Sequence, residues 1–138
     1  MKFIIFVIMK LFLDDLRTVD MVYPNSNMSE WVIVRSFHQF VNYINKYGLP
    51  DYVSFDHDLG FEHTRWYFEN GGHESPPDPS VATFNEKTGY DAAKWLVDYC
   101  SEHDLPIPLW HVHSHNPIGA NNIRSYLKNA EKHLGLGI

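Results

Sequence analysis

The segment that most constrains the fold is Tyr52–Gly60, in which a short apolar strand ends abruptly in two aspartates that flank a histidine. Open α/β sheets bind ligands in the crevice beyond the carboxyl ends of their strands, so charge at such an end is placed for chemistry. The polar tripeptide 56–58 is therefore the first candidate for an active centre. Two other apolar segments, Leu11–Asp15 and Trp110–Asn116, also close in polar side chains. Strands that all end in this way indicate one shared site.

Strands and helices alternate along the chain, which predicts a parallel sheet of four or five strands joined by right-handed crossovers. The segment Leu16–Glu30 has the composition of turns, with room for one helical turn, so we expect the first crossover to be mostly loop. Apolar runs and helical periodicity predict strands at 10–13, 31–35, 52–55 and 109–114, and helices at 37–47, 89–102 and 117–133.

Capping residues mark the predicted helix boundaries. Ser36 and Asn116 stand where an N-cap is expected, and Thr88 is followed at the third position by Asp91. Gly48 ends the first long helix. Two of the helices therefore begin directly beyond a strand end, close to the polar clusters.

The length of 138 residues predicts a single domain over 1–138. Residues 61–87 form a long insertion that includes paired glycines and prolines, and we interpret it as a lid or binding loop because it leaves from the acidic strand end. Residues 1–8 are a candidate N-terminal extension, since a self-sufficient strand begins at Met9. One continuous strand from Lys2 to Leu13 is the alternative. The sequence predicts no oligomeric state.

Composition narrows the range of partners. Seventeen acids against eleven lysines and arginines give a net charge of -6, which argues against direct binding to long nucleic acid but not against a small phosphorylated ligand. The apolar run Phe3–Met9 is too short to span a bilayer and lacks a cleavage site, and the single Cys100 gives no sign of an oxidising compartment. We therefore expect a cytoplasmic protein with no membrane partner.

Carboxylates at the strand ends predict a metal site. Asp14, Asp15 and Asp56, with Asp58 nearby, would converge at one edge of a parallel sheet, and such a group needs a cation or a proton. Oxygen ligands favour a hard ion, so Mg²⁺ or Mn²⁺ is the expected cofactor. Any one of these aspartates could instead cap a helix or face water, but several at the same edge favour metal or phosphate chemistry.

Histidines supply the candidate proton-transfer groups, because an imidazole titrates near neutral pH. His57 and His113 are equal candidates for the catalytic acid or base, and Asp58 is a candidate for proton transfer or its orientation. His111, His113 and His115 alternate along the last strand, as zinc ligands can. A packed His111 is the simpler interpretation.

The start of the last helix predicts an anion site, because free backbone N–H groups and the positive end of the helix dipole would face the same crevice. Asn116 and Gly119 belong to that turn, and the hydroxyl of Ser114 could donate to a phosphate. For each nearby arginine alone, a solvated surface position is the simpler interpretation. The candidate substrate clamps are Arg17, Arg35 and Arg124.

In architecture the chain resembles receiver domains, which carry an acid pair after the first strand, an aspartate after the third and a hydroxyl after the fourth. Asp14, Asp15, Asp56 and Ser114 match those positions. The resemblance implies a receiver-like (flavodoxin-like) three-layer α/β sandwich, Mg²⁺ binding and, as in receivers, phosphorylation of the third-strand aspartate. Two features depart from the pattern: the first crossover helix is reduced, and no fifth strand with the family's lysine follows Ser114.

Five ordered motifs more specifically resemble the cyclic-phosphate processing receiver-like family, over nearly the whole chain from Met9 apart from the insertion. The motifs are Leu11–Arg17, Trp31–Ser36, Ser54–Gly60, Thr88–Asp91 and His113–Gly119. The resemblance implies a metal-dependent hydrolase that opens the cyclic phosphate of a nucleotide derivative, such as the ADP-ribose cyclic phosphate left by RNA repair, with Asp56 as metal ligand or nucleophile. The alternative is a degenerate receiver that accepts a phosphoryl group on Asp56, or binds a nucleotide as a signalling module without turnover.

Overall fold

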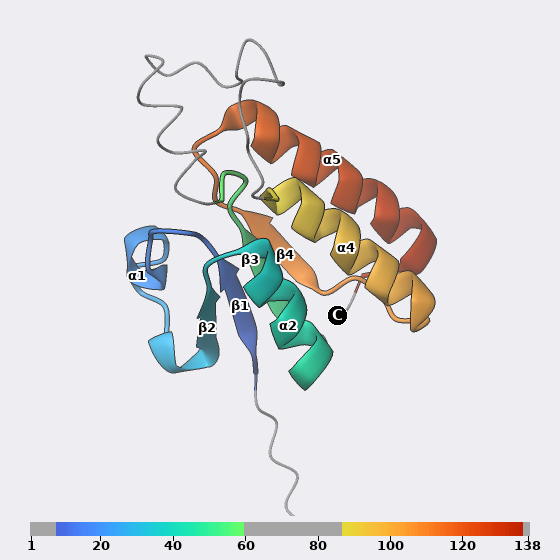
Figure 1. Cartoon of the computed structure of the whole chain (residues 1–138), viewed down its shortest axis with the longest axis horizontal. Helices are drawn as coiled ribbons and strands as arrows, with labels where there is room; N and C mark the ends of the chain where they lie inside the picture. The colour runs from blue at the N-terminus through green and yellow to red at the C-terminus, as the bar shows by residue number, and fades with distance from the viewer. Residues whose placement is uncertain (1–7, 60–86, 137–138) are drawn as a thin grey trace, which may run out of the picture.

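In the part of the chain that the structure describes, four short parallel strands form the central sheet of the fold. The computed structural model describes residues 8–59 and 87–136. The strands are β1 (Lys10–Leu13), β2 (Trp31–Val34), β3 (Tyr52–Phe55) and β4 (Leu109–Val112). Their order across the sheet is β2-β1-β3-β4, so the first strand lies inside the sheet and the last one at its edge (Figure 1).

The register of the strands aligns their carboxyl ends. Leu13 pairs with Phe55, which in turn pairs with Val112. Main-chain hydrogen bonds continue this ladder one residue further. The amide of Asp56 donates to the Leu13 carbonyl at 2.9 Å, and the amide of His113 donates to the Phe55 carbonyl at 2.9 Å. The polar residues that follow the strands are therefore held in place by the sheet itself.

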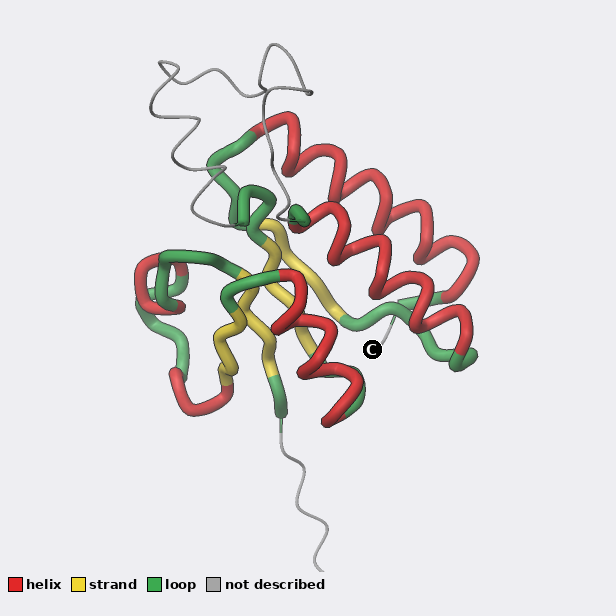
Figure 2. Tube along the Cα trace, viewed as in Figure 1, coloured by secondary structure: helices red, strands yellow, loops and turns green. Residues whose placement is uncertain are grey.

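The long helices all cover the same face of the sheet (Figure 1). The described helices are α1 (Val19–Val22), α2 (Phe37–Tyr47), α4 (Gly89–Glu102) and α5 (Pro117–Leu134), with a 3₁₀ turn at Met28–Glu30. Alternate strand side chains such as Leu11 and Phe55 point to this face and join Phe40 of α2, Leu96 of α4 and Leu127 of α5 in one buried cluster. Loops follow the carboxyl ends of the strands (Figure 2), and Leu59 in the loop after β3 is also part of this buried cluster.

The opposite face of the sheet is covered by aromatic side chains of β1, the first crossover and the start of β2. Phe12 meets the ring of Trp31 edge to face, with centroids 5.9 Å apart, and also contacts Tyr23. The Tyr23 hydroxyl lies 2.7 Å from the hydroxyl of Ser54 on β3. A short helix and two large aromatic rings thus do here what a full crossover helix would otherwise do.

Side-chain caps fix the helix starts, as the sequence predicts. Ser36 accepts a hydrogen bond from the amide of Gln39 at the start of α2. Thr88 and Asp91 form a reciprocal capping box at the start of α4. Asn116 accepts from the amide of Gly119 in the first turn of α5. Each of these helices starts at the residue that its cap predicts.

The structure confirms the predicted receiver-like α/β fold, its parallel sheet and its reduced first crossover. Two strands are shorter than predicted: β2 ends at Val34 and β4 at Val112, because the chain leaves the sheet to form the caps that follow. Leu136 forms a parallel bridge with Ile107, which ties the end of the described chain to the start of β4.

The predicted insertion 61–87, apart from Lys87, and the candidate extension 1–8, apart from Ile8, lie outside the described residues. The choice between a strand that starts near Met9 and one that runs from Lys2 therefore stays open. Within residues 8–59 and 87–136, no helix has both the length and the apolar character needed to cross a membrane.

Candidate functional site

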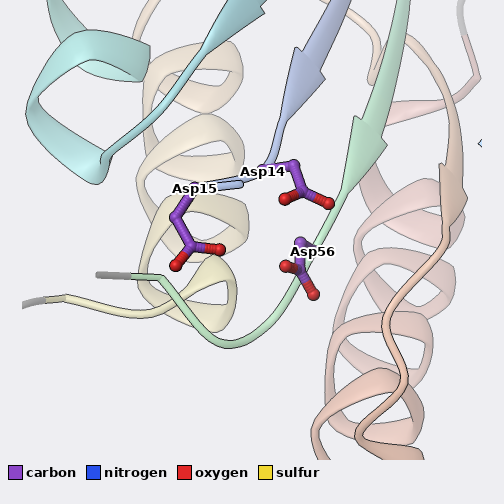
Figure 3. Close-up of side chains that lie close together, drawn as sticks. All are labelled: Asp14, Asp15 and Asp56. Carbon is purple, nitrogen blue, oxygen red and sulfur yellow. The ribbon is translucent and has the colours of Figure 1, made fainter. Parts of the chain in front are cut away.

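Three aspartates converge beyond the carboxyl ends of β1 and β3 (Figure 3). Asp14, Asp15 and Asp56 each offer a carboxylate oxygen, and these atoms lie within 4.8 Å of one another. Asp14 is 1% exposed and Asp56 is 7% exposed, so both carboxyl groups are largely removed from water. The structure thus brings the three predicted metal ligands together in one cluster.

Asp14 accepts hydrogen bonds on both of its carboxylate oxygens. Oδ1 accepts from the backbone N–H groups of Leu16 at 2.9 Å and Arg17 at 2.7 Å. Oδ2 accepts from Arg17 Nε at 2.8 Å and lies 3.1 Å from His113 Nε2. Burial alone would raise the pKa of Asp14, but the hydrogen bond from His113 and the donors of Arg17 and Leu16 hold it well below its usual range. Asp14 is therefore ionised at neutral pH.

The surroundings of Asp56 raise its pKa, whereas those of Asp14 lower the pKa of Asp14. Its Oδ1 accepts from the backbone N–H of His57 at 2.8 Å and lies 3.6 Å from Nη2 of Arg17. Burial, followed by the charge of Asp14, raises the pKa of Asp56 to about 7 against the opposing charge of Arg17. Burial and the charge of Asp14 thus oppose the ionisation of Asp56 more strongly than Arg17 favours it. An all-carboxylate donor set fits a hard divalent cation.

His113 is buried beside the cluster and is engaged at both ring nitrogens. Burial lowers the pKa of His113 despite its hydrogen bond to Asp14, so the ring is neutral at pH 7. Nε2–H then donates to the ionised Asp14, and Nδ1 accepts from the hydroxyl of Ser54 at 2.6 Å. Ser54 in turn contacts the hydroxyl of Tyr23. This geometry favours a positioning role for His113 over the predicted role in proton transfer.

His57 forms a second, more accessible pair with Asp58. Nδ1 of His57 lies 2.7 Å from Oδ1 of Asp58, and the amide group of Asn116 donates to the same oxygen at 3.2 Å. With Nδ1–H donating to Asp58, the lone pair of His57 is on Nε2. Among the described residues, no hydrogen bond engages that nitrogen. An imidazole oriented by a carboxylate at one nitrogen is suited to take up a proton at the other.

Two glycines make room for this arrangement. An alanine Cβ at Gly119 in α5 would lie 2.3 Å from Cγ of His57, so the imidazole ring packs directly on the first turn of the helix. A Cβ at Gly89 in α4 would lie 1.7 Å from the carbonyl oxygen of Asp56, and the Gly89 amide donates to the His57 carbonyl at 2.7 Å. Both helix starts therefore touch the backbone or ring of the site.

The predicted phosphate-binding residues separate into two groups. Ser114 and Asn116 lie in the turn between β4 and α5, where Ser114 Oγ accepts from the Asn116 amide at 3.1 Å. The amide of Gly119 donates to the Asn116 side chain at 2.9 Å, so this N–H is already used by the cap. Arg35 donates from Nη1 to the carbonyl oxygens of Asp14 at 3.3 Å and Arg17 at 2.7 Å, which holds the β1–α1 loop.

The other candidate residues are further from the cluster or differently engaged. Arg124 bonds to Asn121 at 3.1 Å on an exposed part of α5. The interpretation of His111 as a packed residue is wrong, because His111 is exposed, whereas His113 is hydrogen-bonded to Asp14 and Ser54. In the part of the chain that the structure describes, the three aspartates are the one group whose geometry suits a shared metal.

The sequence patterns did not predict the hydrogen-bonded polar side chains that extend from Asp14 through His113 to Ser54 and Tyr23. Tyr23 belongs to a segment whose composition predicts a loop, and Ser54 belongs to a segment whose apolar character predicts a core strand. The available signal was the hydroxyl of Ser54 inside an otherwise apolar strand, because a buried hydroxyl needs a partner. Its partner, His113, could be identified only once the strand order was known.

Comparison with known proteins identifies a family for the chain. A family model described as the cyclic-phosphate processing receiver domain matches residues 9–129. No curated protein and no solved structure matches the chain significantly. The match spans every strand and most of the last helix, and it includes all three clustered aspartates and the pair formed by His57 and Asp58.

Proposed function

The chain belongs to the cyclic-phosphate processing receiver domain family, and from that premise we propose that it is a metal-dependent phosphoesterase that opens the cyclic phosphate of a nucleotide derivative. The observation that supports this proposal most is the placement of two different acid–base environments at one sheet edge. A cluster formed by Asp14, Asp15 and Asp56 lies beside an imidazole oriented by Asp58.

Different residues would bind the metal ion and transfer the proton in the proposed reaction. Asp14, Asp15 and Asp56 would hold Mg²⁺ or Mn²⁺, which when bound polarises a phosphoryl oxygen and neutralises its charge. His57 would accept the proton of the attacking water at Nε2 and return it to the ring oxygen that leaves as the P–O ester bond breaks, and Asp58 would stabilise the imidazolium through Nδ1.

Residues around the cluster complete the proposed site. His113 would keep Asp14 ionised and correctly oriented. The turn that contains Ser114 and Asn116 lies within reach of Asp58 and His57, since the Asn116 side chain contacts both of them. That contact supports binding of the phosphate at this turn, next to the proposed proton-transfer pair.

The direct test is hydrolysis of ADP-ribose cyclic phosphate in the presence of Mg²⁺ or Mn²⁺, followed by ³¹P NMR. We expect conversion of the cyclic phosphate to a phosphomonoester, and a loss of about 100-fold or more in rate for His57→Ala because the positioned base is gone. His38→Ala removes an exposed histidine of α2 and is the matched control, for which we expect the wild-type rate. No conversion by the wild type, or an unchanged rate for His57→Ala, would contradict the proposal.

A second prediction concerns the helix turn under the imidazole. Gly119→Ala should lower the rate by about 10- to 100-fold, because the new Cβ overlaps the ring of His57 and moves Nε2 away from its working position. The rate should be measured alongside thermal unfolding, since the fold should persist. Asn122→Ala, at an exposed position of the same helix, is the control and should leave the rate unchanged. A Gly119→Ala rate equal to that of the control would refute the role given to His57.

The alternative function is a phosphoacceptor or nucleotide-binding signalling module. The same ³¹P experiment separates it, because incubation with a small phosphodonor would then give an aspartyl phosphate signal that Asp56→Asn abolishes. Tight nucleotide binding without product would favour the binding module.

A further inference from the structure

We propose that Arg17 is an internal cation of the acidic cluster, and that its side chain must withdraw before Asp14 can bind a divalent metal. This inference rests on the proposed metal-dependent function and concerns how the chain controls entry to that same site.

The guanidinium of Arg17 lies between the two buried carboxylates. Its Nε donates to Oδ2 of Asp14 at 2.8 Å, and its Nη2 lies 3.6 Å from Oδ1 of Asp56. The same Nη2 donates to the carbonyl oxygen of His113 at 3.2 Å. A positive group thus bridges two of the three carboxylates that a metal would share.

The donors around Asp14 indicate which hydrogen bond a metal ion would have to replace. A carboxylate has about four lone-pair positions for donors or cations. Two are taken by the amides of Leu16 and Arg17, one by the ring of His113 and one by the side chain of Arg17. The amides belong to the turn itself, and His113 is buried. The Arg17 side chain, 22% exposed, is therefore the one donor that can leave without disrupting the fold.

The main chain at Arg17 is held independently of its side chain. Its amide donates to Asp14 Oδ1, and its carbonyl accepts from Arg35 Nη1 at 2.7 Å. The guanidinium can therefore swing away while the loop stays in place. Once released at the edge of the site, its planar set of donors matches a phosphate. Arg17 would thus serve the cluster before metal binding and the phosphate after it, which implies that metal binds first.

The first test is titration with Mn²⁺ alone, followed by the EPR signal of the free ion. Arg17→Gln should bind Mn²⁺ about tenfold more tightly than the wild type, because one charge-assisted hydrogen bond no longer competes. Lys128→Gln removes a positive charge at an exposed position of α5, and should leave the affinity unchanged. Equal or weaker binding by Arg17→Gln would overturn the inference.

The second test uses the wild-type protein, so it does not depend on how well a variant folds. In ¹H–¹⁵N spectra of the arginine Nε–H groups, the Arg17 signal should move as Mg²⁺ saturates the site, whereas that of Arg35 should stay. Metal binding with an unchanged Arg17 signal would refute displacement. This readout distinguishes displacement from a general effect of removing charge.

The outcomes separate this inference from the proposed enzyme activity. Competition between Arg17 and metal without any hydrolysis would support the inference and contradict the enzymatic proposal. Hydrolysis together with equal metal affinities of the wild type and Arg17→Gln would support the enzymatic proposal and contradict the inference. If neither Mn²⁺ nor Mg²⁺ binds the wild type or Arg17→Gln, both proposals fail.

Discussion

Asp56→Asn is expected to abolish turnover and, at pH 8, to make the protein prepared without metal more stable to unfolding. Asn keeps an oxygen that can accept the hydrogen bond from the His57 amide, but it removes the charge on which the proposed metal binding would depend. We expect the rate to fall by at least about 100-fold, as when a principal electrostatic group is removed. The gain in stability follows from the raised pKa of Asp56, since its ionised form is buried beside Asp14.

The pH dependence of that gain has a definite sign. The pKa of Asp56 rises from 3.8 to about 7 on folding, so between these values the folded protein binds a proton that the unfolded chain releases. The contribution of Asp56 to stability is therefore present below about pH 4 and is lost as pH rises through 7. Asn mimics the protonated form throughout. The variant should match the wild type near pH 4 and exceed it by on the order of 2–4 kcal/mol at pH 8.

Urea unfolding at both pH values, in the presence of a chelator, measures this difference. Asp98→Asn, at an exposed position of α4, is the matched control and should change stability little at either pH. A variant that is less stable than the wild type at pH 8 would show that Asp56 does not carry the electrostatic strain assigned to it.

Gly89→Ala should have the largest effect on folding. Its Cβ would lie 1.7 Å from the carbonyl oxygen of Asp56, 2.8 Å from the carbonyl carbon and 3.0 Å from Cα of His57. All of these are backbone atoms, so no side-chain rotation relieves the overlap, and α4 must move away from the end of β3. We expect a loss of about 3 kcal/mol or more in the free energy of unfolding.

The measurement for Gly89→Ala is the urea midpoint by circular dichroism, with Ser101→Ala at an exposed position of the same helix as the control. The control should be neutral or slightly stabilising, because alanine favours helix. Gly89→Ala should also lower the hydrolysis rate in the folded fraction, since Asp56 and His57 move with the strand end. A midpoint equal to that of the control would mean that α4 does not pack against the sheet edge that carries the candidate site.

The sequence predicted where the candidate site lies better than it predicted the contacts between the residues of that site. Asp14 and Asp56 follow apolar strands, and parallel strands end at the same edge, so their convergence follows from local patterns. The N-caps were predictable for the same reason, since Ser36 and Asn116 act on amides only three residues away.

The remaining features depend on contacts between distant segments. The orientation of His113 depends on Ser54 and Asp14, which are 59 and 99 residues away along the chain. Glycine is needed at 89 and 119 because both positions pack closely against Asp56 and His57, which follow β3. The spacing of residues in the sequence does not predict how closely these segments approach each other. The interpretation of Arg35 as a clamp on substrate also changes, because its partners are carbonyl oxygens of a loop that precedes it by many residues.

The extension of the sheet ladder past the strand ends bears on how such a protein can change over time. The positions of Asp56 and His113 are set by hydrogen bonds from their own amides to neighbouring strands, and every residue type except proline has an amide that can make them. A substitution at either position can therefore alter the reactivity of the edge while the backbone keeps its place. The framework and the chemistry are in this sense separable, and the same sheet could acquire a new activity through a few exchanges at its rim.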